Sequence, residues 1–160
     1  HPVNAVKTMN DVCLEAEKSP TAKVSHHRLH ENFEGIDETI ALSSMYAANH
    51  LGARVVATLT QTGKTALWMS RISSNISIFA MSDNNKTLQK VTLYRGVYPC
   101  YIEKTSMDDW NDVNTHVVAN LQSKSAVENG DIAILTKGMH KDKSGGTNLM
   151  KVLRVGDGNY

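Results

Sequence analysis

The apolar positions of the chain follow two different spacings, and together they predict an α/β domain. In several segments apolar residues recur every three or four positions, which is typical of helices that bury one face. Between these segments lie short runs of β-branched and aliphatic residues, which predict buried strands. The expected helices cover residues 1–18, 31–51, 64–72, 84–91 and 106–129, and the expected strands cover residues 54–59, 76–81, 97–102, 132–136 and 149–155.

The order of these segments predicts the topology. Strand and helix alternate through the middle of the chain, so the first three strands should be parallel. A hairpin loop at residues 137–146 joins the last two strands, so the final strand should run antiparallel to its neighbour. We therefore expect a three-layer α/β sandwich, in which a five-stranded, mostly parallel sheet with an antiparallel last strand is flanked by helices.

The pattern also predicts which side chains are buried in two of the helices. Trp68 and Met69 lie one turn inside helix 64–72 and should pack into the core. Helix 31–51 should end at Gly52, because glycine suits the left-handed position that follows a helix. The buried stripe of that helix is expected to contain Ile36, Ile40, Ala47, Ala48 and Leu51, with Ala41 and Met45 beside it.

The first 30 residues are expected to form an amphipathic helix and a linker. The apolar face of helix 1–18 needs another surface to cover it, either the rest of the chain or a second copy. Residues 19–30 are polar and should form the linker. There His26 and His30 stand four positions apart, which could suit a metal ion, but the ligand set is incomplete and solvated histidines are favoured. The apolar face consists of Val3, Val6, Met9, Cys13 and Leu14.

Composition narrows the classes of function. The chain has 160 residues, of which 41% are hydrophobic and 21% charged, as expected for one globular domain. Its net charge is +1, so no overall field favours nucleic acid or an acidic membrane. We expect no signal peptide, and the two cysteines, Cys13 and Cys100, are far apart. We therefore expect a cytoplasmic protein without a disulfide and without a nucleic-acid or membrane partner.

One stretch carries the strongest chemical signal. A buried strand ends near Leu59, the chain turns through small hydroxylated residues at 60–65, and a helix follows. Such a turn should present backbone N–H groups at the positive end of a helix dipole, where anions bind. Thr60, Thr62 and Thr65 add hydroxyl donors, and Lys64 adds a positive charge. We name residues 60–65 the phosphate turn, because these groups together suit a single phosphoryl group.

Two other interpretations of the phosphate turn stay open. Gly63-Lys64-Thr65 matches the second half of the nucleotide-binding loop G-x-x-x-x-G-K-[ST], but Thr58 stands where the first glycine belongs, which argues against an NTPase. The turn could also be only a threonine-rich helix N-cap with a solvated lysine. The basic, glycine-rich loop at residues 137–146 favours a ligand, because such a loop could close over an anion.

Five segments, in the right order, resemble the C-terminal domain of pyruvate kinases. The phosphate turn together with Ala66 matches the effector loop of that family, T-x-[ST]-G-[RK]-[ST]-A. The other segments resemble the family's final barrel helix, its Y-R-G-V-x-P strand entry, its G-D strand and its T-N ending. These four are Pro2–Val6 with Cys13–Glu17, Leu93–Pro99, Gly130–Thr136 and Gly146–Val152, so the resemblance covers nearly the whole chain.

This resemblance implies a role within a larger enzyme. Pyruvate kinases transfer a phosphoryl group from phosphoenolpyruvate to ADP in glycolysis, use Mg²⁺ and usually K⁺, and are usually tetramers. By resemblance, residues 1–18 are the last helix of a missing catalytic barrel, residues 19–30 a linker, and residues 31–160 the effector-binding domain. The catalytic residues and both cations belong to the barrel, so the chain alone should be inactive and should hold no cofactor.

The resemblance also implies an effector site. The phosphate of the effector would contact Thr60, Gln61, Thr62, Gly63, Lys64 and Thr65, and the lid or second contact would be formed by Trp110, His116, Lys143, Ser144, Gly145 and Gly146. Members that bind fructose 1,6-bisphosphate often carry an arginine downstream of the tryptophan. Residues 111–116 contain no arginine, although His116 could partly substitute for it. We therefore expect a sugar monophosphate or AMP as the effector, and a bacterial rather than an animal source.

Two hypotheses of other classes fit the same residues. In one, the domain serves only assembly, and its effector loop no longer binds a ligand. In the other, the chain is a stand-alone module that binds phosphate or a nucleotide without a partner domain. Binding of sugar phosphates would argue against the first, and a native start at His1 would favour the second.

Overall fold

The computed structural model contains the ten helices and strands that the sequence predicts, in the predicted order. It describes residues 1–158 apart from 20–32, 34, 73, 104–109 and 139–145, and the side chains of Trp110 and Asn111 also lie outside the description. The strands are β1 (Val55–Leu59), β2 (Ser77–Ser82), β3 (Val97–Tyr101), β4 (Ile132–Gly138) and β5 (Thr147–Arg154). The helices are α1 (Pro2–Glu17), α3 (Ile36–Leu51), α4 (Lys64–Ser70), α5 (Asn85–Val91) and α6 (Trp110–Ser123).

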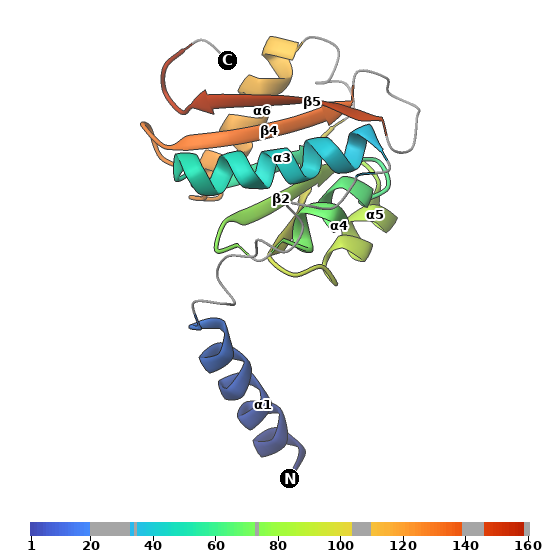
Figure 1. Cartoon of the computed structure of the whole chain (residues 1–160), viewed down its shortest axis with the longest axis vertical. Coiled ribbons are helices and arrows are strands. Elements are labelled where there is room, and N and C mark those ends of the chain that lie inside the picture. Colours follow the sequence, from blue (N-terminus) through green and yellow to red (C-terminus); the bar gives the residue numbers. More distant parts are fainter. Residues whose placement is uncertain (20–32, 34, 73, 104–109, 139–145, 159–160) are drawn as a thin grey trace.

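The strands form one sheet with β1 at its centre (Figure 1). Its order is β3-β2-β1-β4-β5, the first four strands are parallel, and β5 is antiparallel to β4. The predicted five-stranded, mostly parallel sheet with an antiparallel last strand is therefore confirmed. Because β1 lies between β2 and β4, the chain leaves β1 in one direction through β2 and β3 and later returns to its other side.

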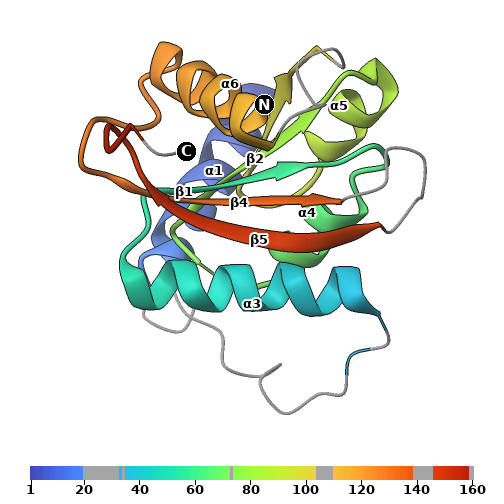
Figure 2. The same cartoon turned by 90° about the horizontal axis from the view of Figure 1, so that it is seen from above.

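Helices cover both faces of this sheet, which makes the predicted three layers (Figure 2). On one face α3, α4 and α5 share a buried cluster with the strands, and on the other face α6 does. The helix layer therefore changes faces where the strand order reverses, between β1 and β4. In sheets of this type, ligands bind at that reversal, outside the carboxyl ends of the two strands.

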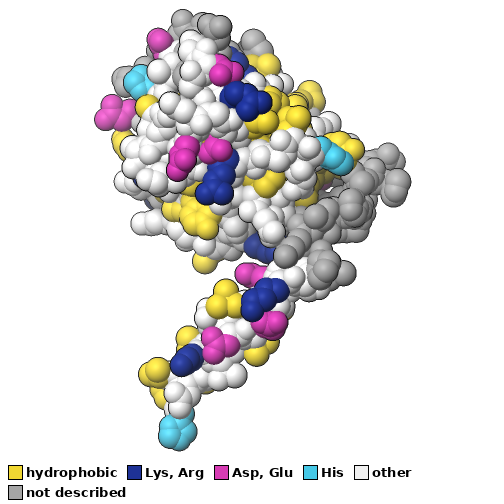
Figure 3. Space-filling view, turned by 90° about the vertical axis from the view of Figure 1, so that its left-hand side faces the viewer, with side chains coloured by type: hydrophobic (Ala, Val, Ile, Leu, Met, Phe, Trp, Pro, Cys, Tyr) yellow, Lys and Arg dark blue, Asp and Glu magenta, His cyan; other side chains and the backbone are white. Residues whose placement is uncertain are grey.

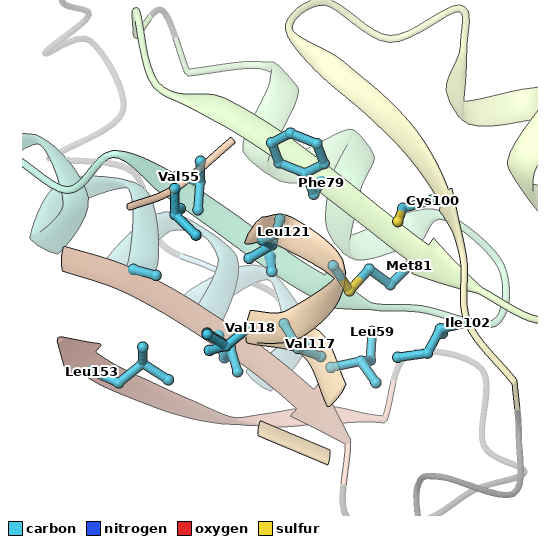
Figure 4. Close-up of a cluster of buried hydrophobic side chains, with 14 of the residues drawn as sticks. Val55, Leu59, Phe79, Met81, Cys100, Ile102, Val117, Val118, Leu121 and Leu153 are labelled. Atoms are coloured by element: carbon cyan, nitrogen blue, oxygen red, sulfur yellow. The ribbon is translucent and has the colours of Figure 1, made fainter. Parts of the chain in front are cut away.

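The cluster under α6 is apolar throughout (Figure 4). Val113, Val117 and Leu121 recur at helical spacing, and each is completely buried against the sheet. Burying an aliphatic side chain of this size contributes about 1.5–3 kcal/mol, so α6 is held chiefly by this face. The strands supply Val55, Leu59, Phe79, Met81 and Leu153, among others.

Together with the opposite cluster, this explains why no residue of β1 is exposed. Val56 points toward α3 and α4, and Ala57 points toward α6, so both faces of β1 are covered. Met69 of α4 is fully buried here and Trp68 packs beside it, as the sequence predicted for both side chains.

The predicted stripe of α3 is partly wrong. The helix begins at Ile36 rather than at residue 31, and Ile36 and Leu51 are 69% and 48% exposed. Ile36 and Leu51 are the first and last residues of α3, so each lies at an end of the helix. Ile40 is half-buried, as is Ala47. The buried apolar residues of α3 are Ala41, Leu42, Met45 and Ala48.

Two other predicted boundaries also shift. The helix expected to reach residue 129 ends at Ser123, because Ser125 adopts a left-handed conformation with φ 54° and stops it. Strand β5 begins at Thr147, two residues before the predicted start, and this places its first residue beside the phosphate turn.

Helix α1 is amphipathic, as predicted, and no described residue of the sheet or its helices covers it. All of its residues are exposed, with Val3 at 78% and Met9 at 68%. Figure 3 shows its apolar side chains in contact with solvent, between charged ones. The expected cover from the rest of the chain is therefore absent among the described residues. None of the helices in the described ranges is both long and apolar enough to cross a membrane.

Candidate functional site

The phosphate turn lies at the carboxyl end of β1, at the reversal of strand order. Gly63 has φ 76°, a left-handed conformation that glycine adopts without strain, and it serves as the N-cap of α4. The hydroxyl of Thr60 accepts a hydrogen bond from the Gly63 N–H at 3.0 Å, and that of Thr62 accepts one from the Lys64 N–H at 3.4 Å. Two threonines thus hold the turn in shape through its own backbone.

The first turn of α4 leaves backbone donors for a ligand. The first N–H groups of any helix have no partner within the helix. The first bond inside α4 joins the Leu67 N–H to the Gly63 carbonyl, and the N–H groups of Thr65 and Ala66 have no acceptor in the described part of the chain. Of the backbone donors expected from the sequence, these two amides remain, because the hydroxyls of Thr60 and Thr62 accept the N–H groups of Gly63 and Lys64.

Lys64 is not the freely solvated cation that the sequence suggests. Its ammonium lies 2.9 Å from Oδ2 of Asp37, in the first turn of α3. The Asp37 side chain is only 7% exposed, whereas that of Lys64 is 49% exposed. The positive charge of the turn is therefore paired with a buried acid, although half of the lysine side chain still contacts solvent.

Thr65 links the turn to the start of β5. Its hydroxyl lies 2.7 Å from the hydroxyl of Thr147, and both side chains are buried. Thr147 directly follows Gly146, the last of the predicted lid residues, so the structure brings that end of the lid to the phosphate turn. A Cβ on Gly138 would lie 2.5 Å from the Gly146 carbonyl oxygen, so both ends of the loop meet beside β4.

Helix α5 adds two contacts that sequence reasoning missed. The Thr87 hydroxyl donates to the Gln61 carbonyl at 2.6 Å, and the Lys90 ammonium donates to the Thr62 carbonyl at 3.4 Å. These residues stand three positions apart on one face of α5, which places a second cation beside the turn. The parallel β-α-β order alone could have indicated that α5 neighbours α4, but not which of its side chains reach the turn.

Two buried hydroxyls lie beneath the reversal of strand order. Thr58 of β1 and Thr136 of β4 are register partners, and both are completely buried. Neither hydroxyl has a hydrogen-bond partner, whereas buried polar groups are normally paired. The carboxyl ends of β1 and β4 are therefore more polar inside than the rest of the sheet.

Of the remaining predicted contacts, only the His116 side chain lies within the described residues. His116 is exposed on α6, and α6 and α4 pack on opposite faces of the sheet. Trp110 begins α6, but its side chain lies outside the described residues, as do Lys143, Ser144 and Gly145 of the lid. The histidines considered for a metal, His26 and His30, also lie outside them.

Cys100 does not have the environment of a reactive thiol. Cys100 is buried, its thiol donates to Oδ1 of Asn120 at 2.9 Å, and burial raises its pKa above the usual value. Cys13 is exposed, and both cysteines are free, in agreement with the expected absence of a disulfide. A cleft of about 260 Å³ near Arg95 and Tyr98 lies at the amino end of β2, at the opposite edge from the phosphate turn.

We expect Thr147→Val to destabilise the domain by about 1–3 kcal/mol, because it leaves the buried Thr65 hydroxyl without a partner. Valine has nearly the shape of threonine, so the loss comes from the hydrogen bond. In the matched double variant Thr65→Val/Thr147→Val, both polar groups are gone and the cost should be no larger than in the single variant. Urea unfolding measures both. A double variant that loses the sum of two such penalties would contradict this assignment.

Comparison with known proteins identifies the family. A family model described as "Pyruvate kinase, alpha/beta domain" matches residues 38–153. The "Pyruvate kinase" of Buchnera aphidicola subsp. Baizongia pistaciae is 41% identical over 156 residues, which cover 97% of this chain and 32% of that protein. The "Pyruvate kinase II" of Salmonella typhimurium is 43% identical over 157 residues, with the same two coverages, 97% and 32%.

A more distant relative is also a pyruvate kinase. The "Pyruvate kinase 2" of Candida glabrata is 30% identical over 168 residues, covering 98% of this chain and 32% of that protein. This chain is thus more similar to these two bacterial relatives than to the Candida protein. The chain spans about a third of the length of these relatives. It belongs to the pyruvate kinase family and carries the family's alpha/beta domain over residues 38–153.

Proposed function

We propose that this chain is the regulatory part of a pyruvate kinase, an enzyme that transfers a phosphoryl group from phosphoenolpyruvate to ADP. In this proposal the phosphate turn binds a phosphorylated small molecule, and residues 31–160 form the effector-binding domain. Residues 1–18 are the last helix of the catalytic barrel, joined by a linker at residues 19–30. The uncovered apolar face of α1 supports this division, because it suits a helix that packs on another domain.

One observation carries the ligand proposal. At the reversal of strand order, the phosphate turn combines the free N–H groups of Thr65 and Ala66 with the half-exposed Lys64. Lys90 adds a second ammonium group. Backbone N–H groups and lysines at the start of a helix after a parallel strand suit a phosphate. A ligand bound here would also contact the end of the lid, since Gly146 precedes Thr147.

The proposed effector is a sugar monophosphate or AMP. One phosphate would bind to the phosphate turn, and Trp110, His116, Lys143, Ser144, Gly145 and Gly146 would contact the rest of the molecule. His116 is the sole basic residue in the first two turns of α6, so a second phosphate would find little charge there. Fructose 1,6-bisphosphate is therefore disfavoured.

The sheet also offers a surface for self-association. Strand β5 is at the edge of the sheet, so one side of its backbone has no strand partner among the described residues. Met150 and Val152 are exposed on it, at 37% and 43%. An open edge with apolar side chains supports assembly of this domain with a second copy, and we propose that it contributes to a tetramer.

Catalysis is assigned to the barrel. Within the described ranges, no group of three or more histidine, cysteine, aspartate or glutamate side chains could hold a metal ion. We place the Mg²⁺ and K⁺ that the family implies in the catalytic barrel. We propose that the chain alone has no pyruvate kinase activity and that the full enzyme is cytoplasmic.

Calorimetric titration tests the effector proposal. We expect one of ribose 5-phosphate, glucose 6-phosphate and AMP to bind the chain, and fructose 1,6-bisphosphate to bind more weakly. The variant Lys64→Ala/Thr65→Ala should lose binding, because it removes one ammonium and one hydroxyl from the turn. The adjacent exposed pair in α1 gives a matched control, Lys7→Ala/Thr8→Ala, which should bind as the wild type does.

The same titration separates the alternatives. If no ligand binds and the chain self-associates, the domain serves assembly only. If a nucleotide binds with the same affinity in the full-length enzyme and in this chain, and activity does not respond, the domain is an independent binding module.

A further inference from the structure

The strongest unexplained contact in the described part of the chain is the ion pair between Asp37 and Lys64. It joins the first turn of α3 to the first residue of α4, and its two charged atoms are 2.9 Å apart. Nothing in the family resemblance requires an acid at this place. The pair therefore needs its own explanation, which rests on the proposed phosphate site.

Asp37 depends on Lys64 as its partner. The aspartate side chain is 7% exposed, and its Oδ2 has no hydrogen bond apart from the ion pair. Gly35 makes room for this carboxylate, because a Cβ there would lie 2.7 Å from Oδ1 of Asp37. A buried carboxylate without a countercharge is unfavourable, so the acid holds the lysine firmly.

We propose that Asp37 is an internal competitor of the phosphate ligand. Without ligand its carboxylate takes the Lys64 ammonium, and a bound phosphate takes over that ammonium and leaves Asp37 without a partner. The carboxylate thus lowers the affinity of the phosphate turn for every anion. Because the two negative charges compete for one ammonium, displacing Asp37 from Lys64 reduces the net binding free energy of the phosphate.

The loss of the Asp37–Lys64 ion pair could transmit ligand binding to the rest of the enzyme. Asp37 lies in the first turn of α3, and α3 follows the segment that leads from α1. Ligand binding would therefore change the interactions at the start of α3, which is the point of the domain nearest in sequence to the proposed barrel helix. Effector binding and the barrel would then be coupled through Asp37, which is paired with Lys64 in the absence of ligand and unpaired in its presence.

Titration of the chain with inorganic phosphate and with ribose 5-phosphate tests this proposal. Asp37→Asn removes the competing charge with little change of shape and should tighten binding of both probes about tenfold. Gly35→Ala keeps the charge but displaces the carboxylate, and its φ of −147° suits alanine, so it should tighten binding severalfold. Glu15→Gln removes the acid of another ion pair, on α1, and should change nothing.

The amide signal of Asp37 gives a second readout. In the wild type, phosphate should shift this signal together with those of the phosphate turn, and in Lys64→Met the shift at Asp37 should disappear. The double variant Asp37→Asn/Lys64→Met should lose the gain in affinity, because no lysine remains to be released. Circular dichroism establishes that each variant is folded.

The outcomes separate the two proposals. If the wild type binds and Asp37→Asn binds equally or more weakly, Asp37 is not a competitor, and the phosphate site stands. If neither the wild type nor Asp37→Asn binds either probe, the phosphate site itself is wrong and the competition falls with it.

Discussion

Replacing Gly63 by alanine should destabilise the domain by about 2–5 kcal/mol and abolish binding at the phosphate turn. Two effects combine. The φ of 76° costs a residue with a Cβ about 1–2 kcal/mol. The new Cβ would also lie 2.8 Å from Cγ1 of Val91, a completely buried side chain of α5, and relieving that overlap costs about 1–3 kcal/mol more.

The matched control for this variant is Gly52→Ala. Gly52 has a φ of 63°, but a Cβ there would meet no atom within 4 Å. Its substitution should therefore cost only the backbone part, about 1–2 kcal/mol. Urea unfolding of both variants measures the difference. Equal losses would show that Val91 does not press on the phosphate turn, and the proposed fit of α5 against α4 would be wrong.

Leu121→Ala should destabilise the domain by about 2–5 kcal/mol, the usual cost of emptying a well-packed leucine site. Leu121 is completely buried in the cluster between α6 and the sheet, where Figure 4 shows it between Phe79 and Val117. The cavity would weaken the face that holds α6. Thermal and urea unfolding measure the loss.

An exposed leucine provides the comparison for this core variant. Leu93 is 85% exposed, so Leu93→Ala should change the free energy of unfolding by less than about 0.5 kcal/mol. If Leu121→Ala were equally mild, α6 would not be packed as the structure shows, and the helix could contribute no fixed contacts to a ligand at the reversal of strand order.

The fold could be predicted because its signals are local. Each strand is a short apolar run, and the turns carry glycines such as Gly63 and Gly52 at left-handed positions. The ends of α3 could not be predicted in this way, because burial at Ile36 and Leu51 depends on which other elements pack against the two ends of the helix, which no local pattern records. Similarly, the end of α6 depends on the left-handed Ser125, a conformation unusual for serine.

Only the part of the site that is continuous in sequence could be predicted. Residues 60–65 form one continuous turn, so their spacing marks them as a group. Asp37, Thr87, Lys90 and Thr147 come from other elements, and contacts across such sequence distances follow from the packing of α3, α5 and β5 around α4. A sequence can show a lysine at the turn, but it does not show that an acid already holds it.

The most direct test of the phosphate turn is an amide NMR titration of the wild-type chain with ribose 5-phosphate, glucose 6-phosphate and AMP. We predict that one of these ligands gives its largest shifts at the amides of residues 61–66, above all at Thr65 and Ala66, whose N–H groups have no acceptor in the described structure. Signals of α1 should stay unchanged. Shifts centred on the cleft near Arg95 instead, or none with any ligand, would contradict the proposal that this turn is the effector site.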